Sequence, residues 1–116
     1  MDIIRVEFPT PLSDIKNIED DNIDVFIELE DGMTYTLVIT TPKNLYTLMR
    51  NEKISYIPAG PSFVIVESLT EKNIIDVIKT YVVNEAYWLK LNFISGELDI
   101  NLLDKKVQQI RVDNDL

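Results

Sequence analysis

Two stretches of strict alternation, separated by three residues, constrain the fold of this chain most strongly. In residues 23–29, every second side chain is apolar, and Asp24, Phe26 and Glu28 point the other way. Residues 33–39 repeat the pattern, with the apolar set Met33, Tyr35, Leu37 and Ile39. A period of two is typical of a strand with one buried face, so the two stretches predict a β-hairpin.

The three residues between the strands decide the register of this hairpin. A two-residue turn would pair Ile27 with Thr36 and send the two apolar sets to opposite faces, which leaves them no common core. A three-residue loop over residues 30–32 instead pairs Ile27 with Tyr35. It also places Gly32 at the left-handed position that such loops require. We therefore expect the three-residue loop, with the acidic residues of the first strand on the solvent face.

Two other segments predict strands elsewhere in the same sheet. Residues 3–8 alternate, and their expected buried set is Ile4, Val6 and Phe8. Residues 63–69 begin with apolar side chains on both faces, which favours an interior strand.

A second hairpin is predicted near the C-terminus. The stretch AYWLKLNFI, residues 86–94, alternates again, and the following Ser-Gly pair allows a two-residue turn. That turn would pair Phe93 with Leu98 and keep the apolar sets in phase. The alternative is that Asp99 caps a helix over residues 100–110.

Two helices are predicted, each from a capping residue followed by an apolar stripe. Thr41 is the expected N-cap of the first helix, and Pro42 is its first residue, where a missing N–H leaves no bond unmade. Its buried stripe comprises Leu45, Leu48 and Met49. Thr70 is the expected N-cap of the second helix, whose apolar face comprises Ile74, Ile75, Ile78, Tyr81 and Val82.

Together these elements predict one α+β domain over residues 1–116. Their order is strand–strand–strand–helix–strand–helix–strand with a further strand, which fits a mostly antiparallel sheet with two helices packed on one face. Residues 13–21 predict a polar connection with one helical turn. Two prolines around a glycine in residues 56–62 predict a stiff loop. The tail from about residue 104 is expected to fray.

The composition argues against most enzyme classes. The chain of 116 residues contains no cysteine and no histidine, which removes thiolate nucleophiles, zinc thiolate sites and the usual general base near neutral pH. No run approaches the roughly 18 apolar residues of a membrane span, and the N-terminus lacks the features of a signal peptide. We therefore expect a cytoplasmic, non-enzymatic protein without a cofactor.

Negative charge is concentrated in the first third of the chain. The net charge is −9, and residues 1–31 carry ten acidic and two basic side chains, a net charge of −8. Such a surface repels phosphate backbones and anionic lipids, so neither a nucleic acid nor a membrane is an expected partner. A basic protein is the partner that this charge favours.

The densest acidic stretch, residues 17–32, does not match a metal or catalytic site. Asp20, Asn22 and Asp24 match the first, third and fifth ligands of a calcium loop, but Val25 stands where that loop needs glycine. Asp24 and Glu28 lie roughly 13 Å apart along an exposed strand, so neither carboxyl group is expected to gain the raised pKa that acid catalysis requires. Two interpretations remain, a solvated face and a surface for a cationic partner.

Large aromatic side chains leave a second question open. Alternation assigns Phe26 and Trp88 to faces that contact either solvent or a layer of helices. If helices cover those faces, the two rings belong to the core, and this is the favoured interpretation because large aromatics in single domains are mostly structural. If no helix covers them, they could anchor a partner. Tyr46, on the back of the first predicted helix, has the same two interpretations.

Most of residues 22–93 resemble small uncharacterised bacterial domains of about this length. The segments that carry the likeness are NIDVFIELEDGMTYTLVITTPKNLYTLM, PSFVIVESLTEKNIIDVIKTYV and AYWLKL. In size, acidity and α+β architecture, the chain is also similar to immunity proteins of bacterial toxin–immunity systems. This resemblance implies a cognate inhibitor that blocks a basic toxin domain without a cofactor. It transfers no functional residue.

The sequence thus predicts a protein-binding domain, an immunity-type inhibitor of a basic toxin domain. One alternative is a self-associating structural or accessory protein whose first strand or tail forms a homo-oligomer interface, and another is an enzyme of unrecognised type. A toxin gene immediately upstream would favour the first interpretation. The expected partner-binding surface comprises Glu19, Asp20, Asp21, Asp24, Glu28, Glu30 and Asp31.

The acidic stretch generates a prediction about metals. Titrating calcium, magnesium or zinc to millimolar levels should leave the melting temperature nearly unchanged, because an ion that bound the native state would raise it by mass action. Thermal unfolding followed by circular dichroism measures this. A rise of several degrees at tens of micromolar metal would refute our interpretation of residues 17–32.

Overall fold

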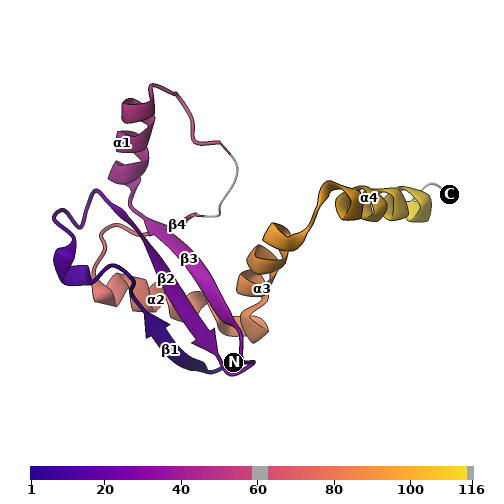
Figure 1. Cartoon of the computed structure of the whole chain (residues 1–116), viewed down its shortest axis with the longest axis horizontal. Helices are drawn as coiled ribbons and strands as arrows, with labels where there is room; N and C mark the ends of the chain where they lie inside the picture. Colours follow the sequence, from indigo (N-terminus) through magenta and orange to yellow (C-terminus); the bar gives the residue numbers. More distant parts are fainter. Residues whose placement is uncertain (59–62, 115–116) are drawn as a thin grey trace.

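The computed structural model describes residues 1–58 and 63–114 of the chain. A four-stranded sheet has the order β1-β2-β3-β4, formed by β1 (Ile3–Glu7), β2 (Asn22–Leu29), β3 (Thr34–Thr40) and β4 (Phe63–Ile65). The first two pairings are antiparallel, and β4 runs parallel to β3. The helical elements are the short η1 (Leu12–Asp14), α1 (Pro42–Glu52), α2 (Glu71–Tyr81), α3 (Val83–Glu97) and α4 (Ile100–Asn114) (Figure 1). The predicted α+β class is confirmed.

The β2–β3 hairpin has the predicted register. Ile27 lies opposite Tyr35, and the same register pairs Val25 with Leu37. Gly32 has a φ of 82°, and its N–H donates to the carbonyl oxygen of Leu29 at 3.0 Å. This left-handed residue closes the three-residue loop, so all inward side chains of both strands share one face.

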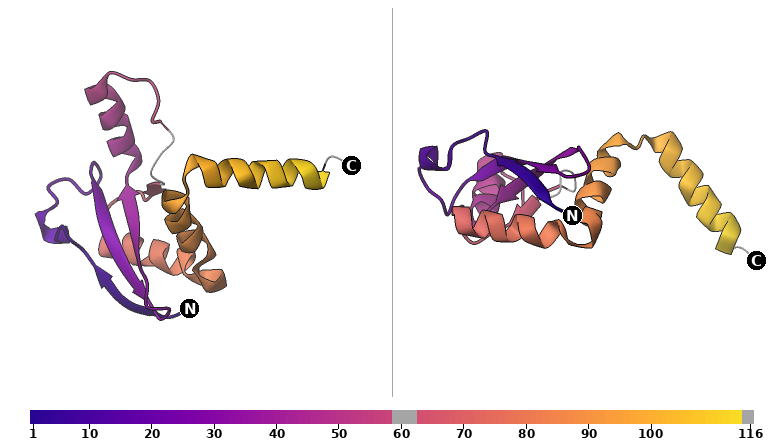
Figure 2. Two further views of the ribbon diagram at one scale, coloured as in Figure 1. Left: turned by 45° about the vertical axis from the view of Figure 1, so that its right-hand side comes forward. Right: turned by 90° about the horizontal axis from the view of Figure 1, so that it is seen from below.

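Helices α2 and α3 cover that apolar face. In the right-hand view of Figure 2, α2 lies along one side of the sheet, below the strands in the picture. Ile74 and Ile78 of α2 are fully buried against the sheet residues, and Leu89 of α3 joins the same core. Each buried side chain of this size contributes about 2 kcal/mol of hydrophobic free energy. The core therefore lies on one side of the sheet, and the predicted apolar face of α2 is confirmed.

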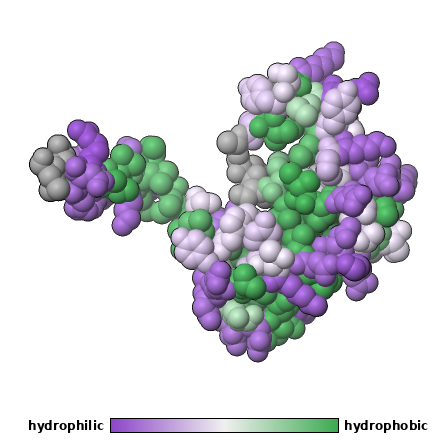
Figure 3. All heavy atoms as spheres, turned by 180° about the vertical axis from the view of Figure 1, so that it is seen from behind, coloured by the Kyte–Doolittle hydropathy of each residue, from purple (hydrophilic) through white to green (hydrophobic). Residues whose placement is uncertain are grey.

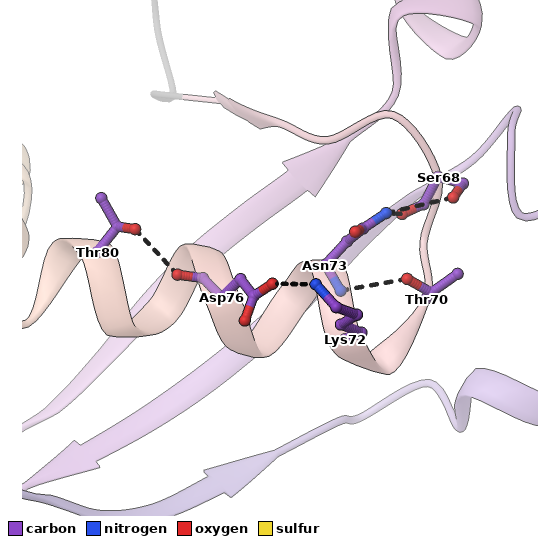
Figure 4. A network of polar contacts seen from close by, with 6 residues as sticks. All are labelled: Ser68, Thr70, Lys72, Asn73, Asp76 and Thr80. Atoms are coloured by element: carbon purple, nitrogen blue, oxygen red, sulfur yellow. Dashed lines mark hydrogen bonds and ion pairs between the residues drawn. The ribbon is translucent and has the colours of Figure 1, made fainter.

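The start of α2 is held by side chains (Figure 4). The Thr70 hydroxyl accepts a hydrogen bond from the backbone N–H of Asn73 at 3.2 Å, as expected of an N-cap. The Asn73 amide in turn donates to the backbone carbonyl of Ser68 at 3.0 Å. Lys72 and Asp76, one turn apart, form an exposed ion pair at 2.8 Å. The bonds of Thr70 and Asn73 fix where the helix begins.

Helix α1 lies elsewhere than expected. Thr41 caps it as predicted, because its hydroxyl accepts from the N–H of Asn44 at 3.2 Å. The helix stands beyond the end of β3 and does not lie on the sheet (Figure 1), and Asn44 is its one buried residue. The predicted stripe of Leu45, Leu48 and Met49 is only half-buried. The helices that pack on the sheet are thus α2 and α3.

The predicted second hairpin is wrong, because residues 86–97 belong to α3 and residues 100–114 to α4. Residues Asn84, Glu85 and Ala86 all have left-handed backbone angles, with φ between 53° and 56°. This turn folds α3 back from α2 and brings Leu89 to the core. The alternative role of Asp99 is confirmed, since its carboxylate accepts from the N–H of Leu102 at 2.9 Å.

Two strand predictions also need correction. Residues 63–69 do not form an interior strand, because β4 spans three residues at the edge of the sheet and Ile65 is 54% exposed. In β1, the pairing with β2 shifts between Ile3 and Arg5, so Ile4 falls in a bulge and is 60% exposed instead of buried. A bulge adds one unpaired residue and reverses the expected alternation.

Some expectations fall partly outside the described residues. The stiff loop predicted over residues 56–62 includes residues 59–62, which the structure does not describe. The described part of the tail, residues 104–114, lies within α4. Of the helices in the described residues, none combines the length and the apolar character needed to cross a membrane.

The loop geometry predicts opposite effects for two glycines. Gly32→Ala should lower the free energy of unfolding by about 1 kcal/mol, because a side chain at a φ of 82° is strained. Gly96→Ala is the matched control: it lies in α3, and should raise stability by up to about 1 kcal/mol through helix propensity. An added Cβ meets no atom within 4 Å at either position, so chemical denaturation isolates the backbone effect. Equal stability changes of one sign would contradict this account of the loop.

Candidate protein-binding surface

The seven predicted partner-binding residues occupy three places along β2. Glu19, Asp20 and Asp21 precede the strand, Asp24 and Glu28 lie within it, and Glu30 and Asp31 follow it at the hairpin tip. Nine residue steps separate Asp21 from Glu30, roughly 30 Å of extended chain. The residues therefore form a long stripe and not one compact cluster.

Asp20 makes hydrogen bonds that stabilise the fold. One carboxylate oxygen accepts from the Asn44 side-chain amide at 3.2 Å, and the other accepts from the Thr47 hydroxyl at 2.9 Å. Asn44 is buried and also accepts from the side-chain amide of Asn22 at 2.9 Å. The Thr41 hydroxyl donates to the carbonyl oxygen of Glu19 at 2.6 Å. This network ties α1 to the residues before β2, so the Asp20 carboxylate is already satisfied.

The acidic residues at the hairpin tip are satisfied as well. Asp31 accepts from the Tyr35 hydroxyl at 2.7 Å and from the N–H of Met33 at 2.9 Å, and these bonds lower the pKa of its carboxyl group. Burial and the neighbouring carboxylate raise the pKa of Tyr35 to about 12. Glu30 accepts from the N–H of Asp2 at 3.0 Å, which joins the tip to β1.

Asp24 and Glu28 differ from these residues. Neither side chain has a hydrogen-bond or ion-pair partner among the described residues. They lie on the face of the sheet opposite α2, with Phe26 between them. The face looks toward the viewer in Figure 1, and no described helix lies over it. These two carboxylates are therefore available to another molecule.

A shallow hollow lies beside Phe26 on this face. Its volume is about 400 Å³, and its lining is Glu7, Phe8, Pro9 and Phe26. Glu7 lies directly opposite Phe26 in the β1–β2 ladder and pairs with Arg5 at 3.4 Å, in an exposed contact. Phe8 is half-buried and also packs against the core, so Phe26 is the ring that this face presents beside a carboxylate. An aromatic ring next to a carboxylate suits the aliphatic stem and positive head of a lysine or arginine. We name Glu7, Phe8, Asp24, Phe26 and Glu28 the open-face site.

Phe26, Trp88 and Tyr46, which the sequence assigned either to the core or to a partner surface, have three different environments. Phe26 is half-buried and lines the open-face site. Trp88 is half-buried against the core, where its ring lies 4.5 Å from the ring of Tyr81, so it joins α3 to α2. Tyr46 is exposed on α1, with the Arg50 guanidinium 5.8 Å from its ring. Only Phe26 of the three lies beside unpaired carboxylates.

Sequence reasoning found Asp24 and Glu28 of this site but not Glu7 and Phe8. The available signal was their place at the end of β1, because the β1–β2 pairing puts Glu7 opposite Phe26 and Phe8 directly follows Glu7. Within the described residues, no three His, Cys, Asp or Glu side chains come together as metal ligands. The chemistry that the site offers is binding of a cation with an apolar stem.

The contact between Tyr35 and Asp31 generates a prediction about pH. Tyr35 stays protonated up to about pH 12 in the folded protein, whereas an unfolded tyrosine ionises near pH 10. The unfolded state alone therefore releases this proton between pH 10 and pH 12, and stability falls as the pH rises. In the Tyr35→Phe variant, the free energy of unfolding should therefore fall less between pH 10 and pH 12 than in the wild type. Denaturant titration at each pH measures this.

Asp31 generates a second prediction about pH, for acidic conditions. Because its pKa is lowered in the folded protein, its contribution is present above about pH 4 and is lost as the pH falls further. Asp31→Asn should therefore lose less stability below pH 4 than the wild type does. Parallel pH profiles for wild type and variant would contradict the role of this hydrogen bond.

Comparison with known proteins adds no family to this description. No protein-family model, no curated protein and no solved structure matches the chain. The likeness to small bacterial domains and to immunity proteins stays a prediction, and the function is inferred from the chemistry of the open-face site.

Proposed function

We propose that the chain is a non-enzymatic domain that binds a basic protein through the open-face site. In this proposal it acts as an immunity-type inhibitor of a basic toxin domain. One observation carries the proposal: Asp24 and Glu28 flank Phe26 on an uncovered face, and neither carboxylate has a partner among the described residues.

Charge and shape at the site support a protein partner over a small molecule. The hollow beside Phe26 is open and shallow, whereas pockets for small molecules bury most of their ligand. An apolar centre ringed by charged residues resembles the centre and rim of a protein interface. A basic side chain of the partner would place its stem on Phe26 and its charge beside Glu7.

Negative charge over the first third of the chain acts at longer range. It draws a basic partner toward the site before contact and raises the association rate, more than it strengthens the final complex. An inhibitor that must capture a toxin domain soon after its synthesis gains from rapid association. Occlusion of a basic active-site surface then requires no chemistry from the inhibitor.

A genetic experiment tests the proposal directly. The product of the gene immediately upstream is expressed in bacteria alone and together with this chain. The proposal expects growth arrest from the upstream product alone, rescue by the chain, and recovery of the two proteins as a complex. An upstream product that does not arrest growth, or arrest without rescue, would contradict the immunity role.

Association kinetics test the site within that complex. The double variant Asp24→Asn/Glu28→Gln should slow association several-fold at low salt, and the difference should shrink toward 1 M salt, where the screening length falls to ~3 Å. The stability of the variant should stay the same or rise slightly, because like-charge repulsion is relieved. Stopped-flow or surface-based kinetics across a salt series measure the effect.

Two controls separate the site from the total charge. Glu71→Gln/Glu85→Gln removes the same charge from exposed positions in the helical layer and should leave association nearly unchanged. Asp20→Asn should instead lower stability by about 1 kcal/mol or more, because it weakens the bonds to Asn44 and Thr47. Equal slowing by both double variants would contradict the open-face site.

A further inference from the structure

The uncovered face of the sheet continues beyond the open-face site, onto β3 and β4. Val38 lies opposite Asp24 in the β2–β3 ladder, and Phe63 lies opposite Val38 in the β3–β4 ladder. Side chains directly opposite one another share a face of the sheet, so Val38 and Phe63 lie on the same side as Asp24. Ile65, two residues after Phe63, points the same way because side chains alternate along a strand.

Four apolar side chains therefore form one diagonal line across this face, Phe26, Val38, Phe63 and Ile65. We name these four residues the apolar strip. Two strand spacings across the sheet and four residues along it give the strip a length of roughly 16 Å. Ile65 is exposed, and the other three are half-buried. Among the described residues, the core and the side chains packed against it do not include these four.

The strand β4 is apolar on both faces. Val64 is buried on the core side, opposite Ile39, whereas Phe63 and Ile65 flank it on the open side. Sheets with parallel pairs such as β3–β4 are typically covered on both faces. No described helix lies over the open side (Figure 1). The composition of β4 thus suits a strand that a further element covers.

The position of the strip limits which element can cover it. Asp24 lies on β2, which is paired with a strand on each side. A partner strand added to either edge of the sheet would lie roughly 10 Å or more from Asp24. An element that contacts both Asp24 and the strip must therefore lie on the face. The strip is one side chain wide, which matches the apolar stripe of a single amphipathic helix.

Charge beside the strip indicates the chemistry of that helix. Asp24 borders the middle of the strip, and Glu7 and Glu28 lie beside Phe26 at its β2 end. Arg5, opposite Glu28, pairs with Glu7. Three carboxylates and one cation leave the described side chains of this face with a net charge of −2. A helix with lysine or arginine beside its apolar stripe complements this face in both charge and hydrophobicity.

We propose that the basic partner binds through an amphipathic α-helix that lies across the open face. Its apolar stripe packs on the apolar strip, and its basic side chains lie beside Asp24, Glu28 and Glu7. This inference rests on the proposed function, because it names the part of the basic protein that the open-face site holds. The strip is about three helical turns long. The bound helix adds a third layer, on the side of the sheet opposite α2.

Two synthetic peptides separate the helix from the charge. Both have the same composition of leucine, lysine and glutamine, about 18 residues in all, long enough to form a helix on binding. In the patterned peptide, leucines recur at intervals of three and four residues with lysines beside them, whereas in the scrambled peptide no face is apolar. The patterned peptide should bind the full chain about tenfold more tightly, because only it buries an apolar stripe. Calorimetry measures the affinity, and circular dichroism should show helix formation on binding.

A double variant tests the apolar strip. Val38→Thr/Ile65→Thr keeps the branch at Cβ and the charge but adds a hydroxyl group to each side chain in place of apolar surface. It should weaken binding of the patterned peptide about tenfold and leave that of the scrambled peptide nearly unchanged. Circular dichroism checks the fold. The single variant Ile65→Thr, at an exposed position, gives a second measurement in the same direction.

Helix α4 supplies the matched control. It also exposes apolar side chains, to which a leucine-rich peptide can adhere (Figure 3). Ile100→Thr/Val107→Thr makes the same two changes at exposed positions of α4 and should leave binding of the patterned peptide nearly unchanged. Loss of binding in this control, with binding kept in Val38→Thr/Ile65→Thr, would place the peptide on α4 and overturn the inference.

The remaining outcomes distinguish failure of this inference from failure of the proposed function. Equal binding of both peptides, lost in Asp24→Asn/Glu28→Gln, would leave the proposed function standing and overturn the helix. Binding of the patterned peptide that tolerates Asp24→Asn/Glu28→Gln would contradict the proposed function. Binding of neither peptide at about 1 mM would contradict both. A dimer of the chain alone that Val38→Thr/Ile65→Thr dissociates would show that a second copy covers the strip, and would overturn the inference.

Discussion

The register of the β2–β3 hairpin determines where every other part of the molecule lies. Its three-residue loop, closed by Gly32 at a φ of 82°, places Ile27 opposite Tyr35. With that pairing, both strands send apolar side chains to the face that α2 and α3 cover. A slip of one residue would send β2's carboxylates into the core, where an unpaired charge carries a large free-energy penalty. One backbone turn therefore creates both the core and the exposed acidic face.

Sequence patterns predicted this hairpin and the starts of α1 and α2 because each depends on local chemistry. The alternation, the glycine in the loop and the Thr41 and Thr70 caps all act within a few residues. The second predicted hairpin failed for a physical reason. Leu89 and Phe93 are two strand repeats apart but also one helical turn apart, so a short apolar run fits both periods. The left-handed turn at residues 84–86 directs the segment into α3, but it contains no glycine or proline that would have predicted a turn there.

The candidate site could be predicted only in part for a related reason. Charge is visible in a sequence, but hydrogen bonds between distant residues are not. Seven acidic side chains along residues 19–31 look equivalent, yet Asp20 reaches Asn44 and Thr47, which follow it by more than twenty positions. Glu7 and Phe8 join the site only through the pairing of β1 with β2. The structure thus reduces a long acidic stripe to Asp24 and Glu28 beside Phe26.

The two faces of the sheet have opposite chemistry because of this arrangement. One face is apolar and packs against α2 and α3, and the other carries Asp24 and Glu28, whose carboxylates have no partner among the described residues. The helices stabilise the domain from one side and leave the other side open. In the proposed function, the single strand β2 therefore supplies side chains both to the core and to the binding surface.

An NMR titration with a lysine-rich peptide, used as a general basic probe, tests the central claim most directly. The claim is that the basic side chains of a partner bind to the unpaired carboxylates of the open-face site. The alternative is that they bind to the acidic surface as a whole. We expect the largest shifts in the side-chain carboxylate carbons of Asp24 and Glu28 and in the ring of Phe26. Asp20 and Asp31, which are already hydrogen-bonded, should shift little. Shifts spread evenly over all acidic side chains, or centred away from Phe26, would contradict the account.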